Sequence, residues 1–97
     1  MNASSFLSSS PSSHQKFSRI FLEQLQKSPQ ARVAAIIRVT ALSPEIEREV
    51  EDAGCLVTRR LRLVPSLAVE GPASALLRLA ESDWVQRIEP DQAVHTL

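Results

Sequence analysis

Residues 55–70 read CLVTRRLRLVPSLAVE, and this stretch decides the expected fold. Apolar and polar side chains alternate along residues 55–64, as in a strand buried on one face, and only Arg59 breaks the series. The positions expected to face inward are Val57, Leu61 and Leu63. Residues 65–66 mark a turn and residues 67–70 form a second, shorter run. The stretch therefore predicts an antiparallel hairpin.

Two further strands flank this hairpin in the sequence. Residues 33–40 form a run rich in β-branched side chains, which is typical of a central strand. Residues 84–89 form the last strand, and Pro90 ends it because proline cannot donate a hydrogen bond to a sheet ladder.

Two helices are expected between these strands. Ser43 and Pro44 are an N-cap and a first helical residue, and the helix that they begin ends at Gly54. Its inward-facing positions are Ile46, Val50 and Ala53. Residues 73–81 are rich in alanine and leucine and predict the second helix.

The resulting order is β-α-β-β-α-β, which predicts an α+β fold of the ferredoxin-like type. Such a sandwich has a four-stranded antiparallel sheet with two helices on one face, so its other face stays open. Many unrelated functions use this fold, and function has to be argued from a site.

The residues before the sandwich divide into two segments. Residues 1–14 contain seven serines and predict a disordered tail. Residues 15–27 predict an amphipathic helix that ends near Pro29, within an N-terminal helix and linker at residues 15–31. The apolar positions of this helix are Phe17, Ile20, Phe21, Leu22 and Leu25. The sequence does not separate a helix that packs on the single folded domain at residues 32–97 or mediates contacts between copies from one that binds a specific partner, and we favour the first two roles.

Composition excludes several functional classes. The chain has 97 residues, and its eleven basic and eleven acidic residues cancel, so no net field attracts nucleic acid or an anionic membrane. A local basic cluster exists at Arg59, Arg60 and Arg62. It lacks the interleaved aromatic rings on which RNA-binding sheets stack bases. No apolar run approaches the roughly 20 residues that span a bilayer, and we expect no membrane partner.

The chain offers little for catalysis or metal binding. His14, His95 and Cys55 are its only histidines and cysteine, and their spacing matches no catalytic triad or metal site. We interpret Cys55 as a small strand residue and not as a nucleophile. The sequence thus predicts a protein that is not an enzyme and has no cofactor. A single cysteine and a start without a signal peptide favour the cytoplasm.

Three motifs carry a resemblance to a known family. They are AGCLV at residues 53–57, SLAVEGP at residues 66–72 and WVQRIEPDQAVHTL at residues 84–97. Together with the element order, they make residues 32–97 similar to the subtilisin propeptide family, also called the inhibitor I9 family. The resemblance covers about two thirds of the chain and implies an inhibitor of subtilisin-like serine proteases.

The resemblance implies a role for the C-terminal tail at residues 90–97. In that family the tail lies in the substrate cleft of the protease as a product-like strand. Leu97 would fill the first specificity pocket and Val94 the fourth, with His95 and Thr96 between them. The acidic pair Glu89 and Asp91 would cap the N-termini of two protease helices, where free N–H groups favour negative charge.

The same resemblance places the open face of the sheet on those protease helices. The residues expected to make this contact are Leu56, Thr58, Arg60, Ala68 and Glu70. We expect a chain that starts at Met1 and stops at Leu97 to act as a monomeric inhibitor, and a cleaved propeptide is the alternative.

Three other interpretations stay open. The protein could also act as a folding chaperone for the protease. It could instead be a ferredoxin-like regulatory or dimerisation module that binds no protease, for which the tail is dispensable. Alternatively, Glu89 and Asp91 could be solvated loop carboxylates, followed by a frayed terminus at residues 92–97.

Overall fold

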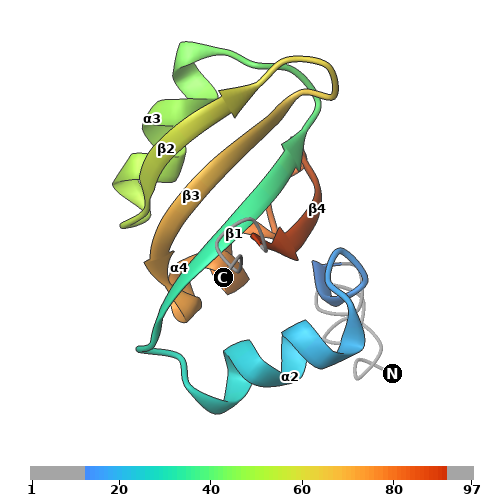
Figure 1. The fold of residues 1–97 in the computed structure, drawn as a ribbon, viewed down its shortest axis with the longest axis vertical. Helices are drawn as coiled ribbons and strands as arrows, with labels where there is room; N and C mark the ends of the chain where they lie inside the picture. The colour runs from blue at the N-terminus through green and yellow to red at the C-terminus, as the bar shows by residue number, and fades with distance from the viewer. Residues whose placement is uncertain (1–12, 92–97) are drawn as a thin grey trace, which may run out of the picture.

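The computed structural model describes residues 13–91 and has an α+β fold with a four-stranded antiparallel sheet (Figure 1). The elements are α2 (Arg19–Lys27), β1 (Arg32–Val39), α3 (Pro44–Asp52), β2 (Leu56–Leu61), β3 (Ser66–Pro72), α4 (Ala73–Leu79) and β4 (Val85–Pro90). From β1 onward their order is the expected β-α-β-β-α-β. No helix within residues 13–91 is long and apolar enough to cross a membrane.

The sheet is organised around β1. Its strand order is β2-β3-β1-β4, so β1 pairs with β3 on one side and with β4 on the other. Both pairings are antiparallel, and both bring large apolar residues into one row, with Ile37 opposite Leu67 and opposite Ile88. The two crossing segments that contain α3 and α4 make this order possible, because β1 and β2 are adjacent in sequence but not in the sheet.

Burial distinguishes the two faces of the sheet. Along β1 the side chains of Ala35, Ile37 and Val39 are fully buried, whereas Arg38 between them is exposed. The buried side chains belong to one core with Val50 of α3 and Leu76 of α4. Figure 1 views the sheet from the opposite side, with α3 and α4 behind it.

The helix that follows β1 begins as the sequence predicts. The Ser43 hydroxyl accepts a hydrogen bond from the Ile46 backbone N–H at 3.2 Å, and Pro44 occupies the first turn. Val50 is buried, and Ile46 and Ala53 pack against the core, so the expected inward face is confirmed. Gly54 then has a φ of 108°, a conformation that other residues rarely adopt.

Two backbone carbonyls of a loop, and not a side chain, cap the N-terminus of α4. Pro72 precedes the helix and makes no side-chain cap. Instead, the backbone N–H groups of Ala73 and Ser74 donate to the carbonyls of Ala31 (2.9 Å) and Pro29 (2.8 Å). The linker between α2 and β1 therefore satisfies the first donors of α4 and ties these three elements together.

The N-terminal helix is shorter than predicted and belongs to the core. Residues 15–17 are not part of α2, because the Ser18 hydroxyl accepts from the Phe21 N–H at 3.2 Å and starts the helix at Arg19. Three of its predicted apolar residues are buried: Phe17, Phe21 and Leu25. Ile20, however, is 69% exposed and contributes nothing to the packing.

The segment before α2 braces the edge of the sheet at β4. The Ile88 backbone N–H donates to the Lys16 carbonyl at 2.9 Å, and the Lys16 ammonium donates to the carbonyls of Ala80 (2.8 Å) and Ser82 (3.0 Å) at the end of α4. Ser13 is only 5% exposed, so the disorder expected for residues 1–14 is wrong for this residue. The rest of that tail up to residue 12 lies outside the described residues.

The hairpin forms at the predicted place with different bounds. β2 ends at Leu61, and the turn begins at Arg62. Leu63, predicted to face inward, is fully exposed, because the chain has already left the sheet there. The side chain of Leu61 is also on the face opposite the one predicted, because the register of β2 against β3 shifts between Val57 and Arg59.

We expect Leu25→Ala to lower the free energy of unfolding by about 2–5 kcal/mol, because it leaves a cavity where α2 meets the core. Ile20→Ala on the same helix is the matched control and should change stability by no more than about 0.5 kcal/mol. Urea unfolding followed by circular dichroism measures both. Equal effects of the two substitutions would show that α2 is not part of the core.

Candidate functional site

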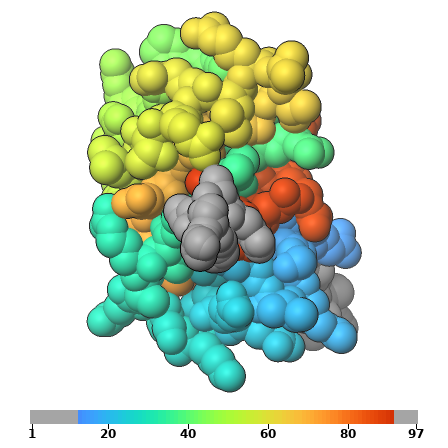
Figure 2. All heavy atoms as spheres, viewed as in Figure 1, coloured from blue at the N-terminus to red at the C-terminus, as the bar shows by residue number. Residues whose placement is uncertain are grey.

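The open face of the sheet is the surface that helices α3 and α4 leave uncovered. By strand register it carries Ala34, Ile36, Arg38, Leu56, Arg59, Leu61, Ser66, Ala68, Glu70, Arg87 and Glu89. Small and apolar side chains lie in the middle of this face, and charged ones lie around them. In the space-filling view from this side (Figure 2), residues of β2 form the yellow-green upper part and α2 lies below in blue.

Most of the predicted contact residues lie on this face. Leu56 and Glu70 are cross-strand partners, and Leu56 is 55% exposed. Ala68 lies between Ile36 and the β2 strand, and it is fully buried although no helix covers it. The Thr58 hydroxyl donates to the Ala68 carbonyl at 3.0 Å, which fixes Thr58 at the edge of the sheet.

Arg60 is not on the open face, and this prediction is wrong. The register of β2 runs from Val57 opposite Val69 directly to Arg59 opposite Ala68, so Thr58 is the extra residue of a β-bulge. A bulge inverts the alternation that follows it. Arg59 takes the place on the open face.

The acidic residues predicted to cap protease helices have different environments. Glu89 remains half exposed, at 50% for its side chain, and its Oε2 atom accepts from Arg87 Nε at 2.8 Å. The Asp91 side chain is only 11% exposed. Its Oδ2 atom accepts from Arg59 Nη2 at 3.2 Å, and its backbone N–H donates to the Ala34 carbonyl at 3.0 Å. Asp91 is therefore held within this protein.

The residues predicted to enter a protease cleft follow Asp91 in the sequence. Val94, His95, Thr96 and Leu97 lie outside the described residues. The last described residue is Asp91, which directly follows the end of β4.

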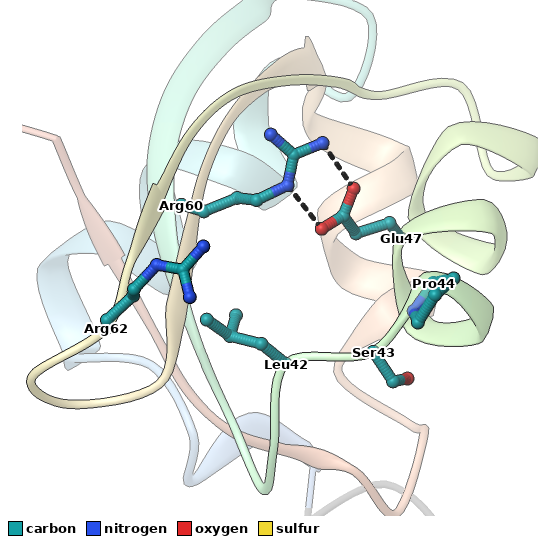
Figure 3. A pocket seen from close by; sticks show the side chains of 6 residues that line it. All are labelled: Leu42, Ser43, Pro44, Glu47, Arg60 and Arg62. Carbon is teal, nitrogen blue, oxygen red and sulfur yellow. Dashed lines mark hydrogen bonds and ion pairs between the residues drawn. The ribbon is translucent and has the colours of Figure 1, made fainter.

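A concave feature on the other side of β2 is an open pocket of about 430 Å³. Its lining consists of Leu42, Ser43, Pro44, Glu47, Arg60 and Arg62. Figure 3 shows the Arg60 guanidinium and the Glu47 carboxylate in direct contact as part of this lining. Arg60 Nε and Nη2 donate to the two carboxylate oxygens at 2.6 and 2.7 Å. This bidentate pair joins β2 to α3, which gives Arg60 a structural role.

The pair changes the acidity of its carboxyl group. Hydrogen bonds from Arg60 hold the pKa of Glu47 below its usual value of 4.5, although partial burial opposes the shift. The same contact raises the pKa of Arg60. The charged form of Glu47 is therefore favoured in the folded protein.

Within residues 13–91 the structure disfavours a reactive thiolate at Cys55 and brings no three potential metal ligands together. Cys55 is 4% exposed, and burial raises the pKa of its thiol, which disfavours a reactive thiolate. A Cβ atom at Gly71 would lie 2.6 Å from the Cys55 sulfur, so this glycine allows the thiol to pack against β3. No group of three potential metal ligands occurs among these residues.

Sequence reasoning missed Arg59 and the β1 side chains of the open face. The run of three polar residues at 58–60 interrupts the alternation of the strand, but it does not show which of them faces the open side of the sheet. The face taken by Ala34 and Ile36 could not be recognised from a run that is apolar on both sides. No protein-family model matches the chain, and no curated protein matches it.

We expect the stability contributed by the Glu47–Arg60 pair to depend on pH. Because the folded-state pKa of Glu47 is lowered, this contribution is present above the usual value of 4.5 and is lost as the pH falls through the folded-state value. Glu47→Gln should therefore destabilise the protein near neutral pH, and its difference from wild type should shrink towards zero as the pH falls through the lowered folded-state pKa of Glu47.

Thermal unfolding over this pH range measures the effect. Glu81→Gln, at an exposed position after α4, serves as the control and should show no such trend. A Glu47→Gln difference that grew as the pH fell would contradict the expected sign.

Proposed function

We propose that the protein inhibits subtilisin-like serine proteases and that residues 32–90 form a ferredoxin-like sandwich of the subtilisin propeptide type. The strand order β2-β3-β1-β4 with antiparallel pairing supports this choice of sandwich. The open face would rest on the protease surface, and the residues after β4 would enter the substrate cleft. The motifs at residues 53–57, 66–72 and 84–97 carry the resemblance on which the protease class rests.

One observation carries the proposal: the open face and the start of the tail lie on the same side of the molecule. Asp91 follows β4 directly, and its side chain reaches Arg59 on the open face. A protein that docked through this face would therefore meet the first residues of the tail in the same contact. No helix within residues 13–91 separates the two.

In the proposed binding mode, the residues after Asp91 lie extended in the substrate cleft. Residues 92–97 follow Asp91 and span at most about 20 Å when fully extended. An extended peptide in a protease cleft gains main-chain hydrogen bonds by strand addition, and alternate side chains enter the pockets. In this proposal Leu97 occupies the first pocket and Val94 the fourth.

The two acidic residues are not equivalent in the proposal. Glu89 is half exposed and belongs to the open face, so it is the better candidate for a protease helix N-terminus. Asp91 would have to exchange its Arg59 partner for such a contact. We therefore propose that Glu89, and not Asp91, is the main residue that caps a protease helix.

A regulatory or dimerisation module is the second candidate function. It is favoured by the outer edge of β2, which pairs with no other strand within residues 13–91 and could pair with a second copy. Such a module would not need the tail. A folding chaperone role would differ from inhibition alone by acceleration of protease refolding.

We expect the 97-residue protein to inhibit subtilisin and to leave a chymotrypsin-fold protease almost unaffected. Leu97→Asp should abolish most of the inhibition, because burying a charge in an apolar pocket is costly. Removal of residues 94–97 should do the same, because it removes the paired strand. Inhibition constants from a chromogenic peptide assay measure these effects. Full inhibition by both variants would contradict tail insertion and favour the second candidate function.

A second prediction concerns the open face. Leu56→Asp should weaken inhibition by at least about tenfold, because it places a charge in the proposed contact. Leu63→Asp is the matched control, since Leu63 is also on the β2–β3 hairpin but lies fully exposed in the turn. The same assay compares the two variants. An equal loss in both would argue against docking through the open face.

A further inference from the structure

We propose that Arg59 is a positioning residue for the tail: its ion pair with Asp91 fixes the place and direction in which the chain leaves the sheet. The inference rests on the proposed function, because it assigns a use to residues 92–97. Nothing in the resemblance to propeptides assigns a role to Arg59. The residue reaches its place only through the bulge at Thr58.

Both the main chain and the side chain of Asp91 make contacts that hold it. Its backbone N–H donates to the Ala34 carbonyl at 3.0 Å and extends the pairing of β4 with β1 by one residue. Its carboxylate binds the Arg59 guanidinium at 3.2 Å. A residue held through both its main chain and its side chain cannot rotate freely. Asp91, the last described residue, is therefore fixed in position and orientation.

The ion pair spans the sheet. Arg59 lies on β2 at one edge, and Asp91 follows β4 at the other, so β3 and β1 separate them. Neighbouring strands are about 4.8 Å apart, which makes the distance between the two backbones roughly 14 Å. The extended Arg59 side chain has to lie flat across the face to cover most of this distance, because the Asp91 side chain is short. The pair therefore draws Asp91 inward over the open face instead of leaving it at the edge.

Two small residues favour this crossing, while Ile36 is the larger side chain opposite Ala68 on the same face. The side chain opposite Arg59 on β3 is Ala68, and the residue that receives the Asp91 N–H on β1 is Ala34. Methyl groups rise little above the sheet, so an arginine stem can pass over them. A large side chain at Ala68 would block the path. The ion pair thus depends on the bulge at Thr58, on the alanines Ala68 and Ala34, and on the acidic residue after Pro90.

Such an anchor has a direct effect on binding. A tail that is already ordered at its root loses less conformational entropy when it enters a cleft. The ion pair itself is partly exposed, since the Arg59 side chain is 49% accessible. Removal of an exposed ion pair changes a binding equilibrium by at most about fivefold. The greater freedom of the backbone at Asp91 adds to the loss of affinity. We expect a total loss of about three- to tenfold in inhibition when the anchor is removed.

The experiment compares Arg59→Gln with Asp91→Asn, the double variant and Arg62→Gln. Arg62 is the matched control, because it is an exposed arginine in the turn of the same hairpin. Two quantities are measured on the 97-residue protein: the exchange rate of the Asp91 amide by NMR, with the Ile37 amide as internal reference, and the inhibition constant for subtilisin.

Arg59→Gln should speed exchange of the Asp91 amide severalfold and leave Ile37 unchanged. It should also weaken inhibition about three- to tenfold, and the double variant should be no weaker than either single variant. Arg62→Gln should match wild type in both measurements. Arg59→Lys, which keeps the charge, should restore part of the protection.

The outcomes separate the two proposals. Unchanged exchange at Asp91 in Arg59→Gln would overturn the anchor, whatever the inhibition. Tighter inhibition by this variant would also overturn it, because the pair would then obstruct docking. Absence of inhibition by the wild-type protein, together with faster exchange in Arg59→Gln, would reject the protease function and retain Arg59 as the residue that holds the tail root.

Discussion

The pairing of β1 in the centre of the sheet is the constraint on which the rest of the structure depends. β1 contributes a ladder to β3 and another to β4, and its residues Ala35, Ile37 and Val39 are fully buried. A shift by one residue would turn these side chains to the open face and bring Arg38 into the core. The register of β1 therefore fixes both what α3 and α4 cover and what remains available to a partner.

The β-bulge at Thr58 determines the character of the open face. Without it, Arg59 would point towards α3 and Arg60 towards solvent. With it, Arg60 binds Glu47 beside α3, while Arg59 crosses the open face to Asp91. One additional residue in the edge strand thus turns two neighbouring arginines to opposite faces of the sheet. Arg60 contacts a helix, and Arg59 anchors the end of β4.

The N-terminal segment contributes to the same body although it precedes the sandwich in sequence. Phe21 and Leu25 of α2 lie in the common core, and Lys16 binds both β4 and the end of α4. A domain of this size buries a limited share of its surface, so additional packing of this kind matters for its stability. In the proposed inhibitor, these contacts lie away from the open face and stiffen the β4 edge from which the tail departs.

The sequence by itself determined the type and order of the elements, because local signals specify them: the Ser43 cap, the Gly54 stop and the β-branched run of β1 act within a few residues. Tertiary structure alone decided the rest. The inward face of β2 after Val57, the start of α2 at Ser18 and the partners of Asp91 depend on contacts between distant segments. Bulges and long ion pairs gain their energy only once the strands are paired, and no local pattern encodes that gain.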